Sequence, residues 1–218
     1  MLEAPSTMIR DIASPPPGLA EARSVTVVIA AWRAAATIGR AVASALAQPE
    51  AAEVIVVDDA SADGDATLSA ARAADDGSGR LTVFALARNA GPAAARNAAI
   101  AASRAPWICV LDSDDFMQPG RLGALLQLAG GGHDLIADDL LQTPEGQPLA
   151  AGKLLWFREN AAPFDVSFGA FVDSNVTRAS RLRREMGFLK PLMRRAFLEK
   201  HTLTYDEAMR LGEDYDLY

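Results

Sequence analysis

The chain has 218 residues, of which 50% are hydrophobic, and a formal net charge of −7 at pH 7. This length allows one substantial hydrophobic core, whereas the acidic balance argues against general nucleic-acid binding, which requires a basic surface. No stretch approaches the roughly 18 consecutive apolar residues of a membrane-spanning helix, and the single cysteine, Cys109, has no partner within the chain for a disulfide.

Residues 1–23 precede the first predicted element. They are rich in Pro, Ala and Ser and lack the apolar core of a signal peptide. Because a segment of this composition buries little apolar surface, we expect a disordered leader. The absence of an export signal and of a cysteine pair indicates a cytoplasmic protein.

Apolar runs and amphipathic segments alternate from residue 24 onward. Runs rich in β-branched residues predict buried strands, and apolar residues spaced by three and four predict helices. The predicted strands are residues 24–31, 53–57, 81–86, 107–111 and 134–137. The predicted helices are residues 36–48, 66–74, 93–103, 121–129 and 192–200. This order predicts an α/β fold with a mostly parallel central sheet and helices on both faces.

The regular alternation ends after about residue 140. Residues 142–147 have the composition of a turn, and the following stretch mixes aromatic and polar residues. The last residues, 213–218, resemble the middle of a helix. We therefore expect that the sequence lacks a C-terminal extension, either naturally or because it is a fragment.

Acidic residues follow two of the predicted strands directly. Asp58-Asp59 follows the second strand, and Asp112-Ser113-Asp114-Asp115 follows the fourth. The carboxyl ends of parallel strands form the edge where open α/β folds bind ligands. Clustered carboxylates raise one another's pKa unless a cation neutralises them, and Mg²⁺ is typically bound by one or two carboxylates and substrate phosphates. The alternative for each group is a local turn or helix cap.

A glycine turn follows the third predicted strand. Gly91-Pro92 opens a helix whose first amides and dipole would suit a phosphate. Arg96 lies one turn further and could offset the acidic edge. Helix capping explains the turn equally well, because the segment carries neither of the established phosphate-loop patterns.

Basic residues gather near the C-terminus of this acidic protein. The group consists of Arg178, Arg181, Arg183, Arg184, Lys190, Arg194, Arg195 and Lys200. One interpretation is a solvated helical face. The other is a binding surface for a diphosphate or an anionic membrane.

Five segments taken together resemble family 2 glycosyltransferases with the GT-A fold. They are Val25–Gln48 (VTVVIAAWRAAATIGRAVASALAQ), Val54–Gly64 (VIVVDDASADG), Asn89–Asn97 (NAGPAAARN), Leu111–Asp115 (LDSDD) and Gly212–Leu217 (GEDYDL). Residues 187–207 are further similar to bacterial exopolysaccharide transferases of the succinoglycan type.

The resemblance implies a nucleotide site at matching positions. Asp59, with Asp58 beside it, would accept a hydrogen bond from the uracil of a UDP-sugar. Trp32 would stack on the base next to Ala31, since any aromatic face serves this purpose. Arg96 would lie near the nucleotide.

The resemblance also implies a metal site and a catalytic base. Asp112 and Asp114 would hold Mg²⁺ or Mn²⁺ on the donor diphosphate, with Ser113 at the nucleotide. Asp214 would take the proton from the acceptor hydroxyl. Asp115 is expected to be a local cap.

These roles imply a metal-dependent inverting glycosyltransferase of exopolysaccharide biosynthesis. The expected donor is UDP-glucose, and the expected acceptor is a saccharide on polyprenyl diphosphate, reached by peripheral contact with the inner membrane. Residues 24–140 would bind the nucleotide sugar, and residues 141–218 would form the acceptor side of a single domain. Two alternatives stay open: a sugar nucleotidyltransferase, and a truncated protein that binds nucleotide without transferring sugar. No nucleic-acid partner is expected.

Overall fold

The computed structural model describes residues 23–63, 65–144, 151–156, 162–174, 176, 186–209 and 212–218. The predicted leader therefore lies outside the described residues except for Arg23. Four members of the basic group also lie outside them, namely Arg178, Arg181, Arg183 and Arg184.

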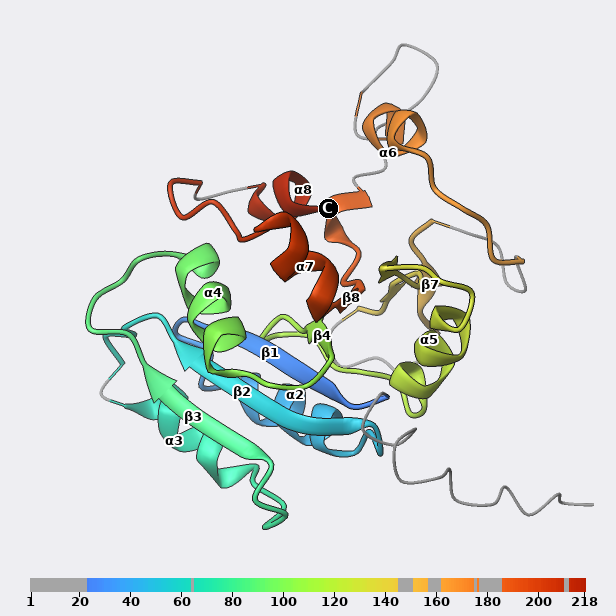
Figure 1. Cartoon of the computed structure of the whole chain (residues 1–218). Coiled ribbons are helices and arrows are strands. Elements are labelled where there is room, and N and C mark those ends of the chain that lie inside the picture. The colour runs from blue at the N-terminus through green and yellow to red at the C-terminus, as the bar shows by residue number, and fades with distance from the viewer. Residues whose placement is uncertain are drawn as a thin grey trace, which may run out of the picture.

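Among the described residues, six strands form a central sheet in the order β3-β2-β1-β4-β8-β5 (Figure 1). Their bounds are β1 (Val25–Ala31), β2 (Ala51–Asp58), β3 (Leu81–Ala85), β4 (Trp107–Val110), β5 (Leu135–Ile136) and β8 (Leu192–Arg194). Strands β3, β2, β1 and β4 are parallel, whereas β8 is antiparallel to both of its neighbours. The predicted α/β fold with a mostly parallel sheet is confirmed. Strands β6 (Leu141–Gln142) and β7 (Lys153–Leu154) pair separately.

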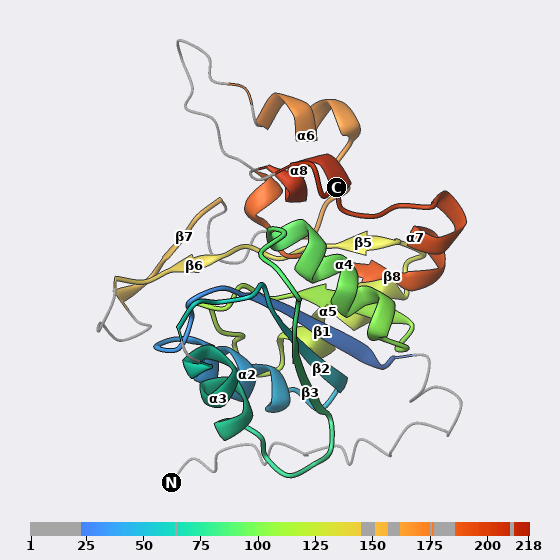
Figure 2. The same cartoon turned by 90° about the vertical axis from the view of Figure 1, so that its left-hand side faces the viewer.

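Helices cover both faces of the sheet (Figures 1 and 2). The helices α2 (Ile38–Leu46), α3 (Ala66–Ala73) and α5 (Arg121–Ala129) pack on one face, and α4 (Pro92–Ala102) and α7 (Arg195–His201) pack on the other. The described residues also include α6 (Phe168–Ser174), α8 (Glu213–Leu217) and a 3₁₀ turn η2 at Met186–Phe188. None of these described helices is long and apolar enough to cross a bilayer.

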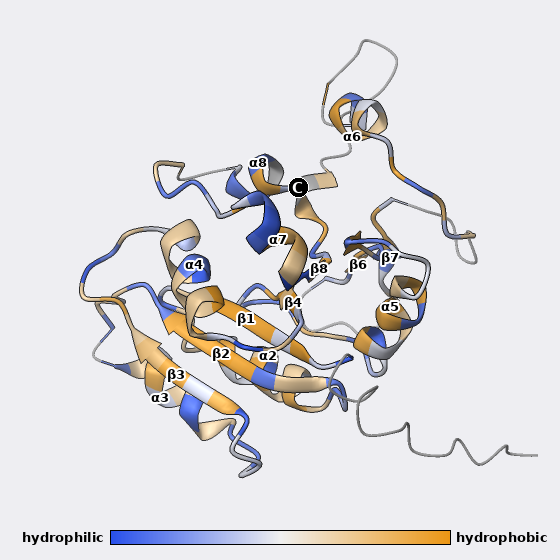
Figure 3. Ribbon diagram, in the orientation of Figure 1, coloured by the Kyte–Doolittle hydropathy of each residue, from blue (hydrophilic) through white to orange (hydrophobic). Residues whose placement is uncertain are grey.

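The alternation of side chains along β1 explains the two-sided core. Val27 and Ile29 pack in a cluster with α2, α3 and α5, whereas Val28 packs in a second cluster with α4 and α7. Successive residues of a strand face opposite sides of the sheet, so a strand covered on both faces is apolar throughout. Figure 3 shows this hydrophobic character in β1. Cys109 is a buried core residue of β4, as expected.

The predicted helix over residues 192–200 is wrong in its first three residues. Leu192 and Met193 belong to β8, and the helix begins at Arg195. Leu192 pairs with Cys109 of β4 and with Ile136 of β5. Successive side chains of a strand point to opposite faces of the sheet. Leu192 and Met193 are therefore buried in the two different core clusters. Non-local pairing thus overrides the local pattern, which is short enough to suit either structure.

Candidate functional site

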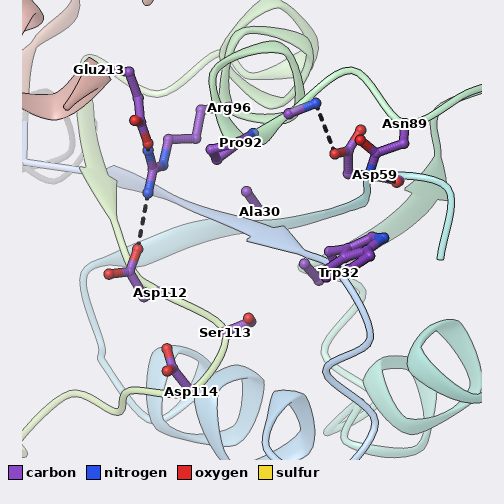
Figure 4. A pocket seen from close by; sticks show the side chains of 12 residues that line it. Ala30, Trp32, Asp59, Asn89, Pro92, Arg96, Asp112, Ser113, Asp114 and Glu213 are labelled. Carbon is purple, nitrogen blue, oxygen red and sulfur yellow. Dashed lines mark hydrogen bonds and ion pairs between the residues drawn. The ribbon is translucent and has the colours of Figure 1, made fainter. Parts of the chain in front are cut away.

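A pocket of about 520 Å³ opens at the carboxyl ends of β1, β2 and β4. Most of the predicted site residues line it, namely Ala31, Trp32, Asp59, Arg96, Asp112, Ser113 and Asp114. The remaining lining residues are Ala30, Asn89, Gly91, Pro92 and Glu213. Figure 4 shows Trp32 and Asp59 at one end and Arg96 at the other. Two predicted residues, Asp58 and Asp214, are not among the lining residues. We call this cavity the first pocket.

Asp59 is fixed by the glycine turn that precedes α4. Its carboxylate accepts the N–H of Ala90 at 2.7 Å and the N–H of Gly91 at 2.8 Å, and Asn89 donates its side-chain amide to the Asp59 carbonyl oxygen at 3.1 Å. Gly91 has a φ of +97°, a conformation that favours glycine. The turn amides that a phosphate would need are therefore bound to Asp59. Each carboxylate oxygen of Asp59 still has capacity for a second donor.

Asp58 stabilises loops rather than lining the pocket. Its carboxylate accepts the N–H of Ser61 at 2.9 Å and the hydroxyl of Ser61 at 2.6 Å. The Ser61 hydroxyl oxygen in turn accepts the N–H of Arg33 at 2.7 Å. Asp58 thus joins the loop after β2 to the loop after β1, as in the local-turn alternative.

Two carboxylates and two cations alternate in a closed ring beside the pocket. Asp112 lies 3.0 Å from Arg96 Nη2 through Oδ1 and 3.1 Å from Lys190 Nζ through Oδ2. Asp214 lies 3.1 Å from Arg96 Nη1 through Oδ1 and 2.7 Å from Lys190 Nζ through Oδ2. We call these four residues the charge ring. It joins α4 and α8 to the loop after β4 and the loop before β8, which are distant in sequence.

The two cations of the charge ring are largely shielded from water, whereas the side chain of Asp112 is 33% exposed. The side chains of Arg96 and Lys190 are 7% and 8% exposed. Burial by itself would raise the pKa of Asp112, but Lys190 and Arg96 outweigh it and the pKa is lowered. Burial would lower the pKa of Lys190, but Asp112 and Asp214 outweigh it and the pKa is raised. Asp112 and Lys190 therefore keep each other in the charged form.

Other side chains extend the ring around Arg96. Glu213 Oε1 lies 2.6 Å from Arg96 Nη1, and the guanidinium carbon of Arg96 lies 5.4 Å from the ring centroid of Tyr205. The hydroxyl of Tyr218 donates to Asp214 Oδ1 at 3.4 Å and lies 3.3 Å from the hydroxyl of Tyr205. Asp214 is thus held by cations and by a tyrosine of the same C-terminal segment.

Lys190 and Glu213 are functional candidates that the sequence alone does not identify. Lys190 stands in the basic group, but it is buried in the charge ring, and Arg194 and Arg195 are bound to Asp134 and to the Ala105 carbonyl. The solvated-helix interpretation of the basic group is therefore wrong for Lys190, whereas Arg194 and Arg195 are partly exposed. The sequence marks Lys190 only as a member of the basic group, because its partners Asp112 and Asp214 are distant in sequence.

Asp114 is the carboxylate that remains for a metal ion. In the described part of the chain its carboxylate has no ion-pair partner, whereas both oxygens of Asp112 face cations. No group of three or more His, Cys, Asp or Glu side chains among the described residues is arranged to hold a metal. Each oxygen of Asp112 faces one cation and keeps a second lone pair. Asp114, with Asp112 as a second ligand, would fit a divalent cation that takes its other ligands from substrate phosphates and water, as Mg²⁺ commonly does.

A second pocket, also about 520 Å³, meets the first at Asp112. Lys190, Asp115 and the exposed aromatic ring of Phe188 contribute to its lining. Burial raises the pKa of Asp115, and the charges of Asp112 and Asp114 raise it further. Asp115 donates its N–H to the Asp112 carbonyl oxygen at 3.1 Å, in a tight turn.

An open, mostly parallel sheet with an acid-lined pocket at the carboxyl ends of its strands is the arrangement in which α/β proteins bind ligands. The sequence matches Glycosyl transferase family 2 over residues 26–209, and the chain belongs to this family.

Two relatives from Rhizobium meliloti (strain 1021) are similar along most of the chain. Succinoglycan biosynthesis protein ExoU is 55% identical over 195 residues, which cover 89% of this chain and 55% of ExoU. Succinoglycan biosynthesis protein ExoO is 42% identical over 205 residues, which cover 93% of this chain and 56% of ExoO. The chain thus spans a little over half the length of these relatives.

Solved structures share the GT-A fold at low sequence identity. S. aureus TarS 1-349 in complex with UDP has a TM-score of 0.57 at 20% identity, covering 88% of this chain and 52% of TarS 1-349. The mannosyltransferase PcManGT from Pyrobaculum calidifontis, in complex with GDP-Man and Mn²⁺, has a TM-score of 0.57 at 18% identity, covering 88% of this chain and 50% of PcManGT. The expected GT-A fold is confirmed.

Proposed function

We propose that the chain carries the donor site and catalytic base of an inverting glycosyltransferase that uses a UDP-hexose, with UDP-glucose as the first candidate, in exopolysaccharide biosynthesis. The observation that carries the proposal is the first pocket, which has a base-binding pair, Trp32 and Asp59, at one end and the charge ring at the other. The printed names of ExoU and ExoO support the pathway. The UDP complex of TarS supports the donor class.

Trp32 and Asp59 would bind the base. Trp32 is 52% exposed at the pocket, and the guanidinium carbon of Arg33 lies over its ring, 4.7 Å from the centroid. The base would therefore stack on the opposite face of the ring. Asp59 has a free lone pair on each carboxylate oxygen, and uracil offers one N–H. The backbone of Ala31 supports this arrangement, because its carbonyl oxygen accepts the Asp59 N–H at 2.8 Å.

Arg96, Asp112 and Asp114 would receive the diphosphate. The Nε of Arg96 is buried and has no hydrogen-bond partner among the described residues, so it can donate to an anionic oxygen. Asp114 and Asp112 would hold Mg²⁺ or Mn²⁺, which neutralises charge on the departing diphosphate. The Mn²⁺ complex of PcManGT supports a divalent cation.

Asp214 would act as the general base. It takes the proton from the acceptor hydroxyl, whose oxygen attacks the anomeric carbon while the bond from that carbon to the diphosphate oxygen breaks. Attack from the face opposite the leaving group converts an α-linked donor into a β-glycoside. No protein nucleophile is required, because the acceptor oxygen forms the new bond directly.

The acceptor would approach through the second pocket, which meets the first at Asp112 and has Lys190 in its wall. This pocket is built largely by residues 110–142 and 188–190, with Leu155 at its edge. We extend the proposal to a saccharide acceptor on polyprenyl diphosphate at the cytoplasmic face of the inner membrane, with peripheral membrane contact. The C-terminal part of the chain, residues 141–218, would help to form this acceptor side.

A donor screen tests the proposed function. The protein is incubated with Mn²⁺ and a panel of UDP- and GDP-sugars, and released nucleotide is measured. A parallel incubation with UTP and glucose 1-phosphate is assayed for pyrophosphate. UDP release from a UDP-hexose is expected, because hydrolysis by water is the usual side reaction of sugar transfer. Pyrophosphate release from UTP and glucose 1-phosphate would instead indicate a nucleotidyltransferase, and UDP binding without any turnover would indicate a nucleotide-binding protein that does not transfer sugar.

A further inference from the structure

Lys190 links the two functional carboxylates of the proposed site through a single atom. Its Nζ lies 3.1 Å from Asp112 Oδ2 and 2.7 Å from Asp214 Oδ2. Both contacts are within charge-assisted hydrogen-bonding distance, and they use two of the three N–H donors of the ammonium group. The Lys190 ammonium group therefore sets how far apart the two Oδ2 atoms lie, while Arg96 contacts the two Oδ1 atoms.

The backbone of Lys190 is fixed as firmly as its side chain. Arg121 donates Nη2–H to the Lys190 carbonyl oxygen at 2.7 Å, and it also binds Asp138 through Nε and Nη2. The side chain of Arg121 is 11% exposed. Directly after Lys190 and Pro191 the chain enters β8, which is paired on both sides. The ammonium group thus projects from a rigid support.

Lys190 does not belong to the first pocket. It lines the second pocket, whereas Asp112 lines both. A lysine that bound the donor phosphates directly would be expected to reach the first pocket. Its hydrogen bonds point instead to Asp112 and Asp214, so it can influence the reaction by holding these carboxylates in place.

We propose that Lys190 is a positioning residue that sets the catalytic base Asp214 relative to the donor-site carboxylate Asp112. This inference rests on the proposed function. Without Lys190, Asp214 keeps Arg96 and Tyr218 as partners, and Asp112 keeps Arg96. The donor site remains assembled, but the Asp214 carboxylate loses its contact at Oδ2 and can change its orientation. Displacing a catalytic group by about 1 Å lowers the reaction rate about 100-fold.

The test measures UDP-glucose hydrolysis and UDP binding with Mn²⁺ for Lys190→Met, Asp214→Asn and the double variant. Lys190→Met is expected to lower kcat about 100-fold while the Kd for UDP changes less than about threefold. The double variant is expected to be no slower than Asp214→Asn alone, because Lys190 acts through Asp214. UDP release is followed with a detection limit at least tenfold below the Asp214→Asn rate. Lys200→Met, at an exposed position of α7, is the matched control and should retain the parent rate.

Lys190→Arg keeps the charge and is expected to retain more activity than Lys190→Met. If Lys190→Met does not fold, Lys190→Arg with and without Asp214→Asn supplies the same comparison. The positioning role would be overturned if Lys190→Met left kcat unchanged, or if it weakened UDP binding by as large a factor as it lowered kcat. It would also be overturned if the double variant were slower than Asp214→Asn by the full factor of Lys190→Met. If the parent protein binds no UDP and hydrolyses no nucleotide sugar, the proposed function fails and the inference fails with it.

Discussion

At the scale of single residues, side-chain cations neutralise part of the acidic edge of the sheet. Asp112 lies between Arg96 and Lys190, and Asp214 faces the same two cations. For Asp112, these two cations lower the pKa of the carboxyl group and hold it in one orientation. The carboxylate of Asp114, unlike that of Asp112, has no ion-pair partner among the described residues.

Replacing Asp214 by Asn tests the base. The variant is expected to bind UDP within about threefold of the parent affinity and to lose about 10²–10⁴-fold in the rate of sugar transfer or donor hydrolysis, the usual contribution of a general base. Calorimetry gives the affinity, and UDP release gives the rate. Glu213→Gln is the comparison, because Glu213 lines the pocket beside it. A parent rate in Asp214→Asn together with a large loss in Glu213→Gln would move the role of base to Glu213.

Removing the ring of Trp32 tests base stacking. Trp32→Ala is expected to weaken UDP binding about tenfold, since stacking of a base on an aromatic ring contributes about 1–3 kcal/mol. Trp32→Phe, which keeps an aromatic face, should recover most of the affinity. Equal affinities for Trp32→Ala and the parent protein would show that the base binds elsewhere.

Asp114→Asn tests the metal site. Mn²⁺ is expected to increase the affinity of the parent protein for UDP, and this increase should disappear in Asp114→Asn, because an amide is a poorer ligand for a hard cation than a carboxylate. Asp115→Asn is a suitable control, since Asp115 lines the second pocket and not the first. Calorimetric titration of UDP with and without Mn²⁺ gives the comparison. An undiminished metal effect in Asp114→Asn would exclude Asp114 as a ligand.

Residues at strand ends could be predicted from the sequence, because an acid directly after an apolar run must lie at the sheet edge. This argument found Asp59 and Asp112. It also selected Asp58, whose carboxylate turns toward Ser61, because a strand pattern does not say which of two adjacent acids faces the pocket. Lys190 could not be found this way, since its role depends on the non-local pairing of β8 with β4.

At the scale of secondary-structure elements, Glu53 of β2 connects β1 to the loop before β4. Its Oε2 accepts the hydroxyl of Thr26 at 2.5 Å, the N–H of Arg104 at 2.9 Å and the N–H of Ala105 at 3.1 Å. The two amides lie between α4 and β4, where regular structure leaves donors unpaired. Glu53 therefore holds in place the loop that leads into β4, the strand that Asp112 follows.

The pH dependence of stability tests this connection. Burial by itself would raise the pKa of Glu53, but the hydrogen bonds from Thr26, Arg104 and Ala105 outweigh it and lower the pKa below its usual 4.5. The contribution of Glu53 to stability is therefore present above the unfolded-state pKa and lost as the pH falls through the folded-state pKa. Glu53→Gln is expected to lower the free energy of unfolding by about 1 kcal/mol at neutral pH.

Urea unfolding of Glu53→Gln and the parent protein should give a smaller stability difference at about pH 3 than at about pH 7. Glu199→Gln, at an exposed position of α7, is expected to have little effect at either pH. A difference that is the same at both values would mean that Glu53 acts through packing and not through its charge.

Elements could be predicted well where their signals are local. The strands β1, β2 and β4 follow from apolar runs, and α4 follows from Pro92 at its first position. The strand β8 could not be predicted, because three residues carry too little periodicity to distinguish a strand from a helix. Its conformation is decided by hydrogen bonds to β4 and β5.

At the scale of the whole molecule, the first pocket joins distant parts of the chain. Trp32 follows β1, Asp59 follows β2, and Glu213 begins α8. A ligand that spans the pocket therefore contacts segments from both ends of the described chain. Binding to such a site stabilises the folded state by mass action, because the unfolded chain does not form the pocket.

UDP with Mn²⁺ is therefore expected to raise the Tm of the protein. At a ligand concentration 100 times the Kd, the stabilisation is about 2.7 kcal/mol, which corresponds to about 5–10 °C for a domain of this size. Thermal unfolding with and without ligand gives the shift. ADP with Mn²⁺ should give a clearly smaller shift if Asp59 recognises uracil, and equal shifts would argue against base recognition by this residue.

The position of β8 has a consequence for how the chain reaches its native state. Strand β8 lies between β4 and β5, which precede it by a long stretch of sequence. During synthesis, β4 and β5 leave the ribosome well before the strand that separates them, so the edge of β4 stays unpaired and open to wrong partners. Contacts of such long sequence separation form slowly. When β8 pairs with β4 and β5, it completes the central sheet and brings Lys190 to Asp112. We therefore expect the proposed catalytic centre to form only after this part of the core has formed.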